Sequence, residues 1–136
     1  MKVKRLCLLL CVSAVSVMAL CGGAVRAWAA PAPTTTTLAV TSGGSAVTTV
    51  APGSVVTLTA TVTTGGTPVT VEKVNFCDAS ATYCTDIHLL GTAQLTKSGT
   101  TSIKFRPGVG SHIYKAVFAG TPNGASEDGA TGGFNE

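Results

Sequence analysis

The stretch that decides the fold is "VTLTATVT", residues 56–63, in which apolar side chains and threonines alternate without interruption. Val56, Leu58, Ala60 and Val62 fall on one side of an extended chain, and the four threonines fall on the other. Because successive side chains of a β-strand point to opposite faces of a sheet, this segment predicts a strand with one buried face. The β-branched threonine suits the outer face of such a strand.

The same period of two recurs along the chain, and helical periodicity is absent. Short segments are separated by turn-forming residues at intervals that are typical of an antiparallel sandwich. We predict strands over residues 37–41, 46–50, 56–63, 69–76, 88–95, 101–105 and 112–119. In the later strands, the side chains expected to point inward are Val74, Phe76, Leu89, Ala93, Leu95, Ile103 and Phe105. A parallel sheet would need crossover helices, for which the chain has no room. The predicted class is therefore an all-β, antiparallel β-sandwich of six to seven short strands.

Residues 1–29 have the three parts of a secretory signal peptide. A basic start (Lys2, Lys4 and Arg5) precedes an apolar run over residues 6–20. Small residues flank Trp28, which places cleavage between Ala29 and Ala30. An uncleaved anchor is disfavoured because this run is shorter than the roughly 20 residues that a spanning helix needs. We expect a chain that is secreted, periplasmic or held at the cell surface, with no membrane contact after cleavage.

Charge and cysteine content change when the leader is set aside. The chain after residue 29 carries five basic and six acidic residues, a net charge of −1, so a basic patch for nucleic acid is not supported.

Of the five cysteines, only Cys77 and Cys84 remain, and an even number in an oxidising compartment predicts a disulfide. Cys77 is expected to face outward, next to the inward Phe76. Closing so short a loop stabilises a fold by about 2–3 kcal/mol in the loop-entropy model.

No set of side chains has the spacing that catalysis or metal binding requires. Structural zinc usually shows paired short spacings, which are absent around the candidate ligands Cys77, Cys84, Asp86, His88 and His112. A cysteine nucleophile needs a base and an orienting group, and His88 near Cys84 is better explained as a surface histidine. Calcium loops alternate several oxygen ligands, unlike the scattered acids Asp78, Asp86, Glu127 and Asp128. Tyr83 is one exposed ring, a poor sugar platform. We therefore predict no catalytic, cofactor-binding or metal-binding residues.

Three stretches, "PGSVVTLTATV", "VNFCDASATYC" and "GSHIYKAVFAG", resemble the Ig-like repeats of large secreted and cell-surface bacterial proteins. In that family "VTLTATV" is strand B, "EKVNF" takes the place of strand C, and "YKAVF" that of strand F. The resemblance covers residues 34–120 and implies an Ig-like domain over 37–120, preceded by a Pro/Thr-rich linker over 30–36. Tyr114 is similar to the tyrosine corner of Ig sandwiches, where the hydroxyl bonds back to the chain just upstream, here "RPGVG".

The resemblance also implies a strand G after strand F, and the sequence there departs from the family. Residues 126–136 read "SEDGATGGFNE", with Phe134 as the one large apolar side chain, and glycine disfavours a strand interior. We therefore expect strand G to be missing and residues 121–136 to form a flexible, Gly-rich tail. This predicts a single, C-terminally truncated copy of a repeat, or a domain that another chain completes.

The function implied is that of a non-enzymatic, secreted Ig-like module, a structural spacer or adhesive repeat whose partners are other Ig-like repeats. The alternative is a binding module for a cell-surface protein or glycan. In that alternative, the open edge of strand F, around Lys115, would accept a partner's strand by β-augmentation.

Overall fold

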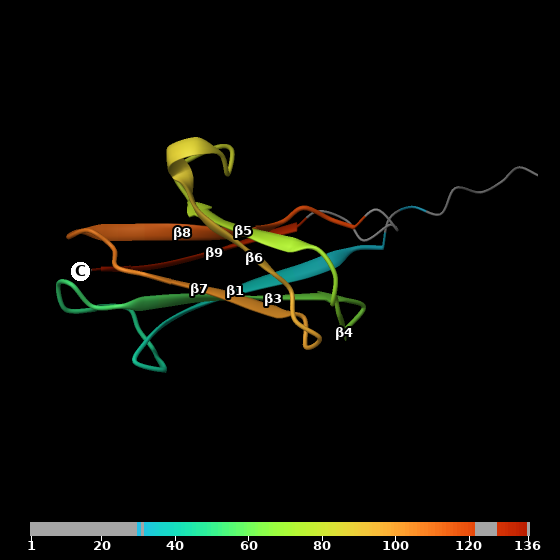
Figure 1. Cartoon of the computed structure of the whole chain (residues 1–136), viewed down its shortest axis with the longest axis horizontal. Helices are drawn as coiled ribbons and strands as arrows, with labels where there is room; N and C mark the ends of the chain where they lie inside the picture. The colour runs from blue at the N-terminus through green and yellow to red at the C-terminus, as the bar shows by residue number, and fades with distance from the viewer. Residues whose placement is uncertain (1–29, 31, 122–127, 136) are drawn as a thin grey trace, which may run out of the picture.

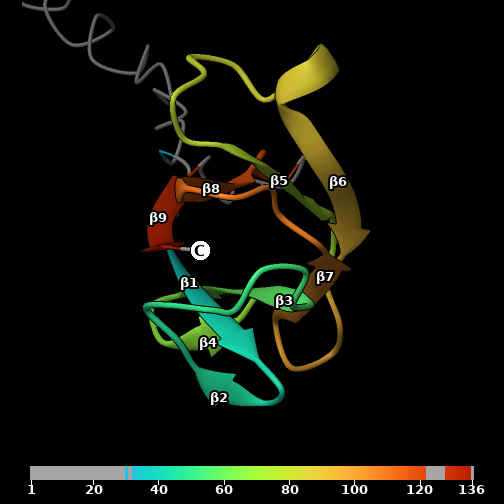
Figure 2. The same ribbon diagram turned by 90° about the vertical axis from the view of Figure 1, so that its left-hand side faces the viewer.

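The computed structural model describes residues 30, 32–121 and 128–135. These residues form two antiparallel β-sheets that face one another, and the prediction of an antiparallel β-sandwich is confirmed. Figures 1 and 2 show the two layers, with the strands running along the long axis of the molecule.

The first sheet is built around β3 (Val56–Thr64), the strand with the clearest alternation in the sequence. β1 (Thr34–Ser42) pairs along the whole of β3 and continues through a tight turn into β2 (Ser45–Ala46). On its other side, β3 pairs with β7 (Thr100–Phe105) and, at its end, with the short β4 (Thr67–Pro68). β3 thus anchors this layer.

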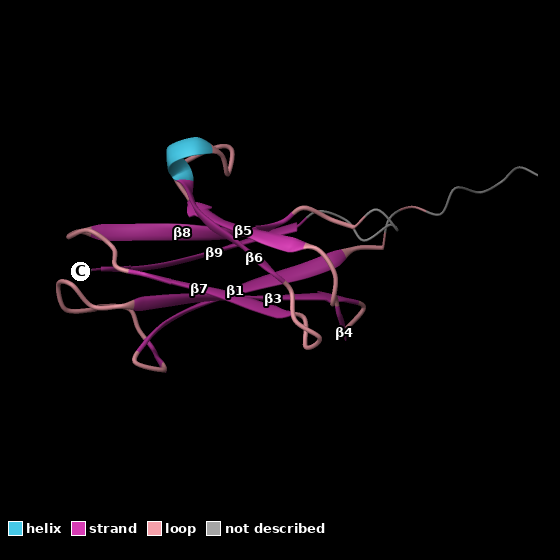
Figure 3. Cartoon of the chain, in the orientation of Figure 1, coloured by secondary structure: helices cyan, strands magenta, loops and turns pink. Residues whose placement is uncertain are grey.

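The second sheet has the order β6-β5-β8-β9. Its members are β5 (Lys73–Asp78), β6 (Leu89–Gln94), β8 (Ser111–Phe118) and β9 (Asp128–Asn135). The one helical element among the described residues is the short 3-10 helix η1 (Asp86–His88), which stands outside the sandwich in Figure 3. We call residues 79–88, which connect β5 to β6 and carry η1, the projection.

The alternation predicted for β3 is confirmed, because Val56, Leu58, Ala60 and Val62 are all fully buried. They belong to one core cluster with inward side chains of the second sheet, including Val74, Phe76, Ala116 and Phe118. Burying a large apolar side chain contributes about 1.5–3 kcal/mol to folding. This double layer of apolar side chains is the core of the sandwich.

Several strand boundaries differ from the predictions. β1 begins at Thr34, so the last part of the predicted linker 30–36 is paired with β3. The predicted strand over 46–50 is reduced to β2 and one bridge at Thr49. β5 starts later than residue 69, since Glu72 has a φ of 74°, which is incompatible with an extended strand.

One predicted inward residue, Leu89, is 37 % exposed, and the prediction for this side chain was wrong. The reason is a β-bulge: Phe76 is opposite Gly91, whereas Cys77 is opposite Leu89, so Leu90 is an extra residue in β6. A bulge shifts the period of two by one position. Leu90 consequently packs against the core in place of Leu89.

The prediction that strand G is missing was also wrong. Residues 128–135, assigned to the flexible tail, form β9, which pairs with β8 along its full length, from Phe118–Asp128 to Ser111–Asn135. Phe134 is 4 % exposed and joins the core cluster. The end of β9 also hydrogen-bonds to the first layer, where Asn135 accepts from Val50 N and donates to Thr48 O. Of the rest of the predicted tail, Thr121 is described and lies outside any strand, whereas residues 122–127 and 136 lie outside the described residues.

The glycines that argued against a strand are the residues that let β9 fit. A Cβ on Gly132 would lie 3.2 Å from Val40 Cγ2 of β1, and a Cβ on Gly133 would lie 2.9 Å from the backbone oxygen of His112. β9 therefore approaches β8 too closely for a side chain at Gly133, and a side chain at Gly132 would need Val40 to shift by a few tenths of an ångström. Close backbone approach is a recognised reason for glycine in a strand.

This geometry predicts that Gly133→Ala destabilises the fold by about 1–3 kcal/mol, the range for forcing extra atoms into a packed site. The clash is with backbone, which cannot move aside as a flexible side chain can. Thermal and urea unfolding of the full chain would measure the loss.

Gly129→Ala, on the same strand, is the matched control because its nearest neighbour would be at 3.4 Å, an ordinary contact. That variant should be neutral or slightly stabilising, since alanine loses less backbone entropy than glycine. Equal effects of the two substitutions would contradict the close-packing explanation for β9.

Candidate functional site

A disulfide connects the projection to the end of β5. Cys77, at the end of β5, is bonded to Cys84 within the projection, with the two Cα atoms 5.5 Å apart. This separation lies within the usual range for disulfides. The pair predicted from the sequence is therefore placed together by the fold.

Cys77 lies on the outer face of its sheet, as its position next to inward Phe76 predicted. It is nevertheless 0 % exposed, although it is not a member of the core cluster. Its neighbours in the sheet are Leu89 of β6 and Lys115 of β8, and its sulfur is bonded to Cys84. In Figure 1 the projection rises from this side of the second sheet. The disulfide thus lies on the outer side of the second sheet, apart from the core cluster.

Lys115 holds the projection against the sheet. Its backbone lies opposite Cys77 in the β5–β8 ladder, and its ammonium group donates hydrogen bonds to the carbonyl oxygens of Ala81 and Thr82. A further backbone bond, from Ala79 N to Ile113 O at 2.9 Å, extends the ladder into the first residue of the projection. The projection is therefore fixed at several points besides the disulfide.

Asp78 shapes the turn that starts the projection. Its Oδ1 accepts a hydrogen bond of 2.8 Å from the backbone N–H of Ser80, an Asx turn. This hydrogen bond is the main reason that the pKa of Asp78 is lowered from its ordinary value of 3.8, with smaller contributions from the positive potential of His88 and His112. The carboxyl group is thus ionised at neutral pH.

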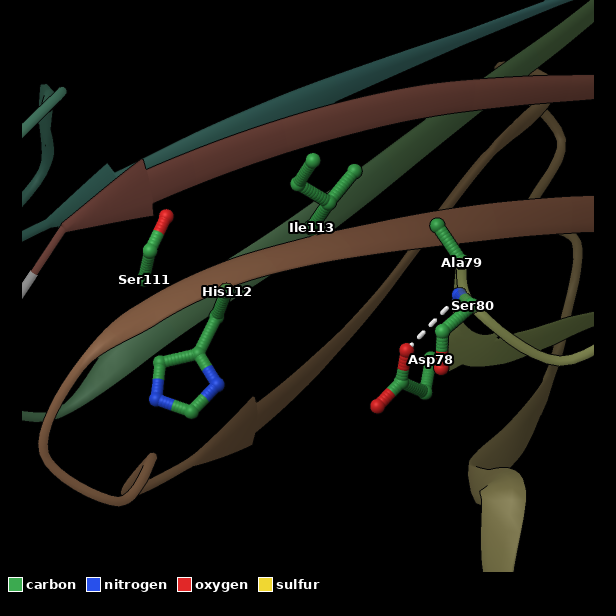
Figure 4. Close-up of a pocket in the computed structure, with 6 residues that line it drawn as sticks. All are labelled: Asp78, Ala79, Ser80, Ser111, His112 and Ile113. Carbon is green, nitrogen blue, oxygen red and sulfur yellow. Dashed lines mark hydrogen bonds between the residues drawn. The ribbon is translucent and has the colours of Figure 1, made fainter.

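A hollow of about 530 Å³ lies at the foot of the projection, between the end of β5 and the start of β8. Figure 4 shows the residues that line it: Asp78, Ala79, Ser80, Ser111, His112 and Ile113. The wall combines one carboxylate, two hydroxyl groups and an imidazole with the apolar side chain of Ile113. Such a mixed wall can accept a polar or cationic group of a ligand more readily than a purely apolar one.

Next to this hollow, a cluster of aromatic rings connects β8 with β7 and β9. The ring of Tyr114 packs edge-to-face on Phe105, with centroids 5.1 Å apart, and lies 5.7 Å from the ring of Phe134. His112 stacks on Tyr114 and hydrogen-bonds through Nε2 to the carbonyl oxygen of Gly108. His112 thus links β8 to the upstream loop. The tyrosine-corner bond of Tyr114 stays a prediction.

The structure does not assemble the alternative metal and nucleophile sites. Both cysteines are in the disulfide, which removes them as zinc ligands and as nucleophiles. Within residues 30, 32–121 and 128–135, no group of three or more His, Cys, Asp or Glu side chains is placed to hold a metal ion. Of the acids considered for calcium, Asp78 lines the hollow and Asp86 starts η1, whereas Glu127 lies outside the described residues.

Two features of this region had no signal in the sequence. The role of Lys115 depends on a loop that folds back across the sheet, and period-two alternation marked it only as an outward residue. The exposure of Ile87, at 93 %, results from its place on η1, which was not expected in a chain without helical periodicity. The exposure expected for Tyr83 is confirmed, at 75 %.

Comparisons with models of known protein families, with curated proteins and with solved structures returned no significant match. In the described part of the chain, no helix has the length and apolar character needed to cross a bilayer. The predicted signal peptide and its cleavage between Ala29 and Ala30 concern residues 1–29, which lie outside the described residues.

We expect reduction of the Cys77–Cys84 bond to lower the free energy of unfolding by about 2–3 kcal/mol, the loop-entropy value for an eight-residue ring. The sandwich itself should persist, because its core cluster does not include Cys77. Urea unfolding of the full chain with and without reductant, followed by far-UV circular dichroism, would test this. Complete loss of β-structure on reduction would show that the sandwich itself depends on the disulfide.

Asp78 should make stability depend on pH in the acid range. Since its folded pKa is lowered, its stabilising contribution is complete above the ordinary value of 3.8. That contribution is lost as the pH falls through this value and then through the lower folded pKa. Asp78→Asn keeps an oxygen that can accept from Ser80 but removes the charge, so it should weaken the turn at neutral pH.

The melting temperatures of the wild type and Asp78→Asn should therefore differ at pH 7 and converge once the pH falls well below 3.8, where the Asp78 carboxyl is protonated in both the folded and the unfolded chain. The measurement is a series of thermal melts of both proteins from pH 7 to well below 3.8. Two curves that stay parallel throughout would rule out a contribution from the Asp78 carboxylate.

Proposed function

We propose that this chain is a secreted, non-enzymatic Ig-like module that acts as a structural spacer or adhesive repeat. The strand arrangement supports the resemblance found in the sequence. β3 pairs with β1 and β7, as strand B pairs with A and E in Ig sandwiches, and β5, β8 and β9 have the order C-F-G. β6 joins the sheet of β5, as the extra strand of variable-type domains does.

The observation that carries the proposal is the placement of the first and last strands. β1 begins at one end of the long axis and β9 finishes at the other, marked C in Figure 1. The two strands lie next to one another, since Gly132 packs on the side chains of Leu38 and Val40. Asn135 also forms a parallel bridge with Thr49. A chain built this way can join two neighbouring segments, one attached at each end of its longest dimension.

This arrangement suits a module that bears load. Pulling on the two ends of the described chain draws β1 and β9 in opposite directions along their axes. The ladder between β8 and β9, together with the bonds of Asn135 to Thr48 and Val50, is then loaded in shear. In shear, the hydrogen bonds of a ladder must fail together, whereas peeling breaks them one pair at a time.

The binding role through an open edge of β8 is not retained. β9 occupies that edge from Ser111 to Phe118, so no ladder position there is left for a partner's strand. The proposal therefore rests on the closed sandwich and not on strand addition.

Single-molecule force spectroscopy on the full chain tests the load-bearing role. Handles at the two ends apply shear, while handles at Val109 and the C-terminal end peel β9 from β8, because Val109 precedes the position where Ser111 and Asn135 pair. Val109 is 79 % exposed, so a handle there does not disturb the fold.

The expected result is an unfolding force several times higher in shear than in peeling. Equal forces in the two directions would contradict a mechanical role for the arrangement of β1 and β9. Loss of folding in a handle variant is detected independently by its circular dichroism melt.

A further inference from the structure

The projection carries two of the most exposed large apolar side chains of the described surface. Ile87 on η1 is 93 % exposed, and Tyr83, beside the disulfide, is 75 % exposed. An isolated exposed apolar residue is ordinary on a protein surface. Here two exposed apolar side chains lie on one short segment, whose ribbon extends away from the sandwich in Figure 2. Both side chains are therefore open to contact by another molecule.

The projection is held rigidly for a surface loop. The disulfide, the bonds from the Lys115 ammonium group, the backbone bond between Ala79 and Ile113, and the turn at Asp78 all fix its base. Rigidity matters because a side chain that is already ordered loses less entropy when it is buried by a partner. Tyrosine also supplies a large contact area at low entropic cost.

The hollow at the foot of the projection adds a second element with a defined charge. Asp78 lines it, next to Ser80 and Ser111, and Ile113 forms an apolar part of its wall with 58 % of its surface exposed. Asp86 adds a second negative charge, on η1 of the projection. A hollow lined by a carboxylate and hydroxyl groups offers hydrogen-bond acceptors to the ammonium or guanidinium group of a Lys or Arg side chain.

We propose that the projection and the hollow together form a docking surface for another protein. The partner buries Ile87 and Tyr83 against apolar side chains and inserts a Lys or Arg side chain beside Asp78. This partner is a separate protein and not a glycan, because a branched aliphatic side chain offers no flat face for a sugar ring. The proposal is independent of the load-bearing role and concerns a different face of the molecule.

The test uses a phage-displayed library of random 12-residue peptides, selected against the full chain. Such a library samples both required elements, a basic residue and neighbouring apolar residues. The enriched peptides are expected to contain both a basic residue and apolar residues. They should also compete with one another for one site. Their affinities are then measured by isothermal titration against the variants Ile87→Ser, Tyr83→Ser and Asp78→Asn.

Ile87→Ser and Tyr83→Ser should each weaken binding about tenfold or more, the effect of removing a central contact. Asp78→Asn should weaken the basic peptides and reduce the salt dependence of their binding. Val109→Ser is the matched control, a similarly exposed apolar residue on the loop before β8, and it should leave binding unchanged. Since all four positions are exposed or at the surface, thermal melts should show that every variant folds.

Three outcomes would overturn the proposal. The library could yield no enriched peptide, or the winners could lack basic residues and bind the Ile87 and Tyr83 variants as tightly as the wild type. The third is self-association of the full chain, seen by sedimentation and abolished by Ile87→Ser, which would make a second copy the occupant of this surface.

Discussion

The fit of β9 between β8 and β1 is the constraint on which the rest of the molecule depends. With β9 in place, the edge of β8 is satisfied, Phe134 completes the aromatic cluster around Tyr114, and the two layers are joined through Asn135. A side chain at Gly133 would clash with the backbone of β8, and one at Gly132 would press on Val40 of β1. The strand that looks weakest by composition is therefore the one that closes the sandwich.

The sequence was sufficient to predict the layers of the fold wherever alternation was regular. In β3 the period of two identified each buried side chain correctly, because one face meets the core along the whole strand. The prediction failed for Leu89, where a bulge shifts the period by one residue. Bulges depend on how two strands pair, and that information is not contained in either strand alone.

β9 was missed for a related reason. Propensity assigns glycine a cost that is independent of its surroundings. At Gly133 the decisive quantity is instead the distance to a carbonyl oxygen of β8, which only the assembled sheet defines. The disulfide could be predicted because elimination of the leader cysteines left two residues at short range. By contrast, the exposed Ile87 and the hollow beside Asp78 arise from the path of the projection, which no local pattern encodes.

The covered position of Cys77 has a consequence for the chemistry of its bond. Thiol–disulfide exchange requires an attacking thiolate to reach a sulfur atom. Cys77 has no exposed surface, whereas its partner Cys84 is partly exposed. Attack on the folded molecule is therefore directed to the Cys84 side of the bond, which leaves a mixed disulfide on Cys84 and releases Cys77 as the thiolate. The burial of one partner thus sets which of the two sulfur atoms a reductant meets first.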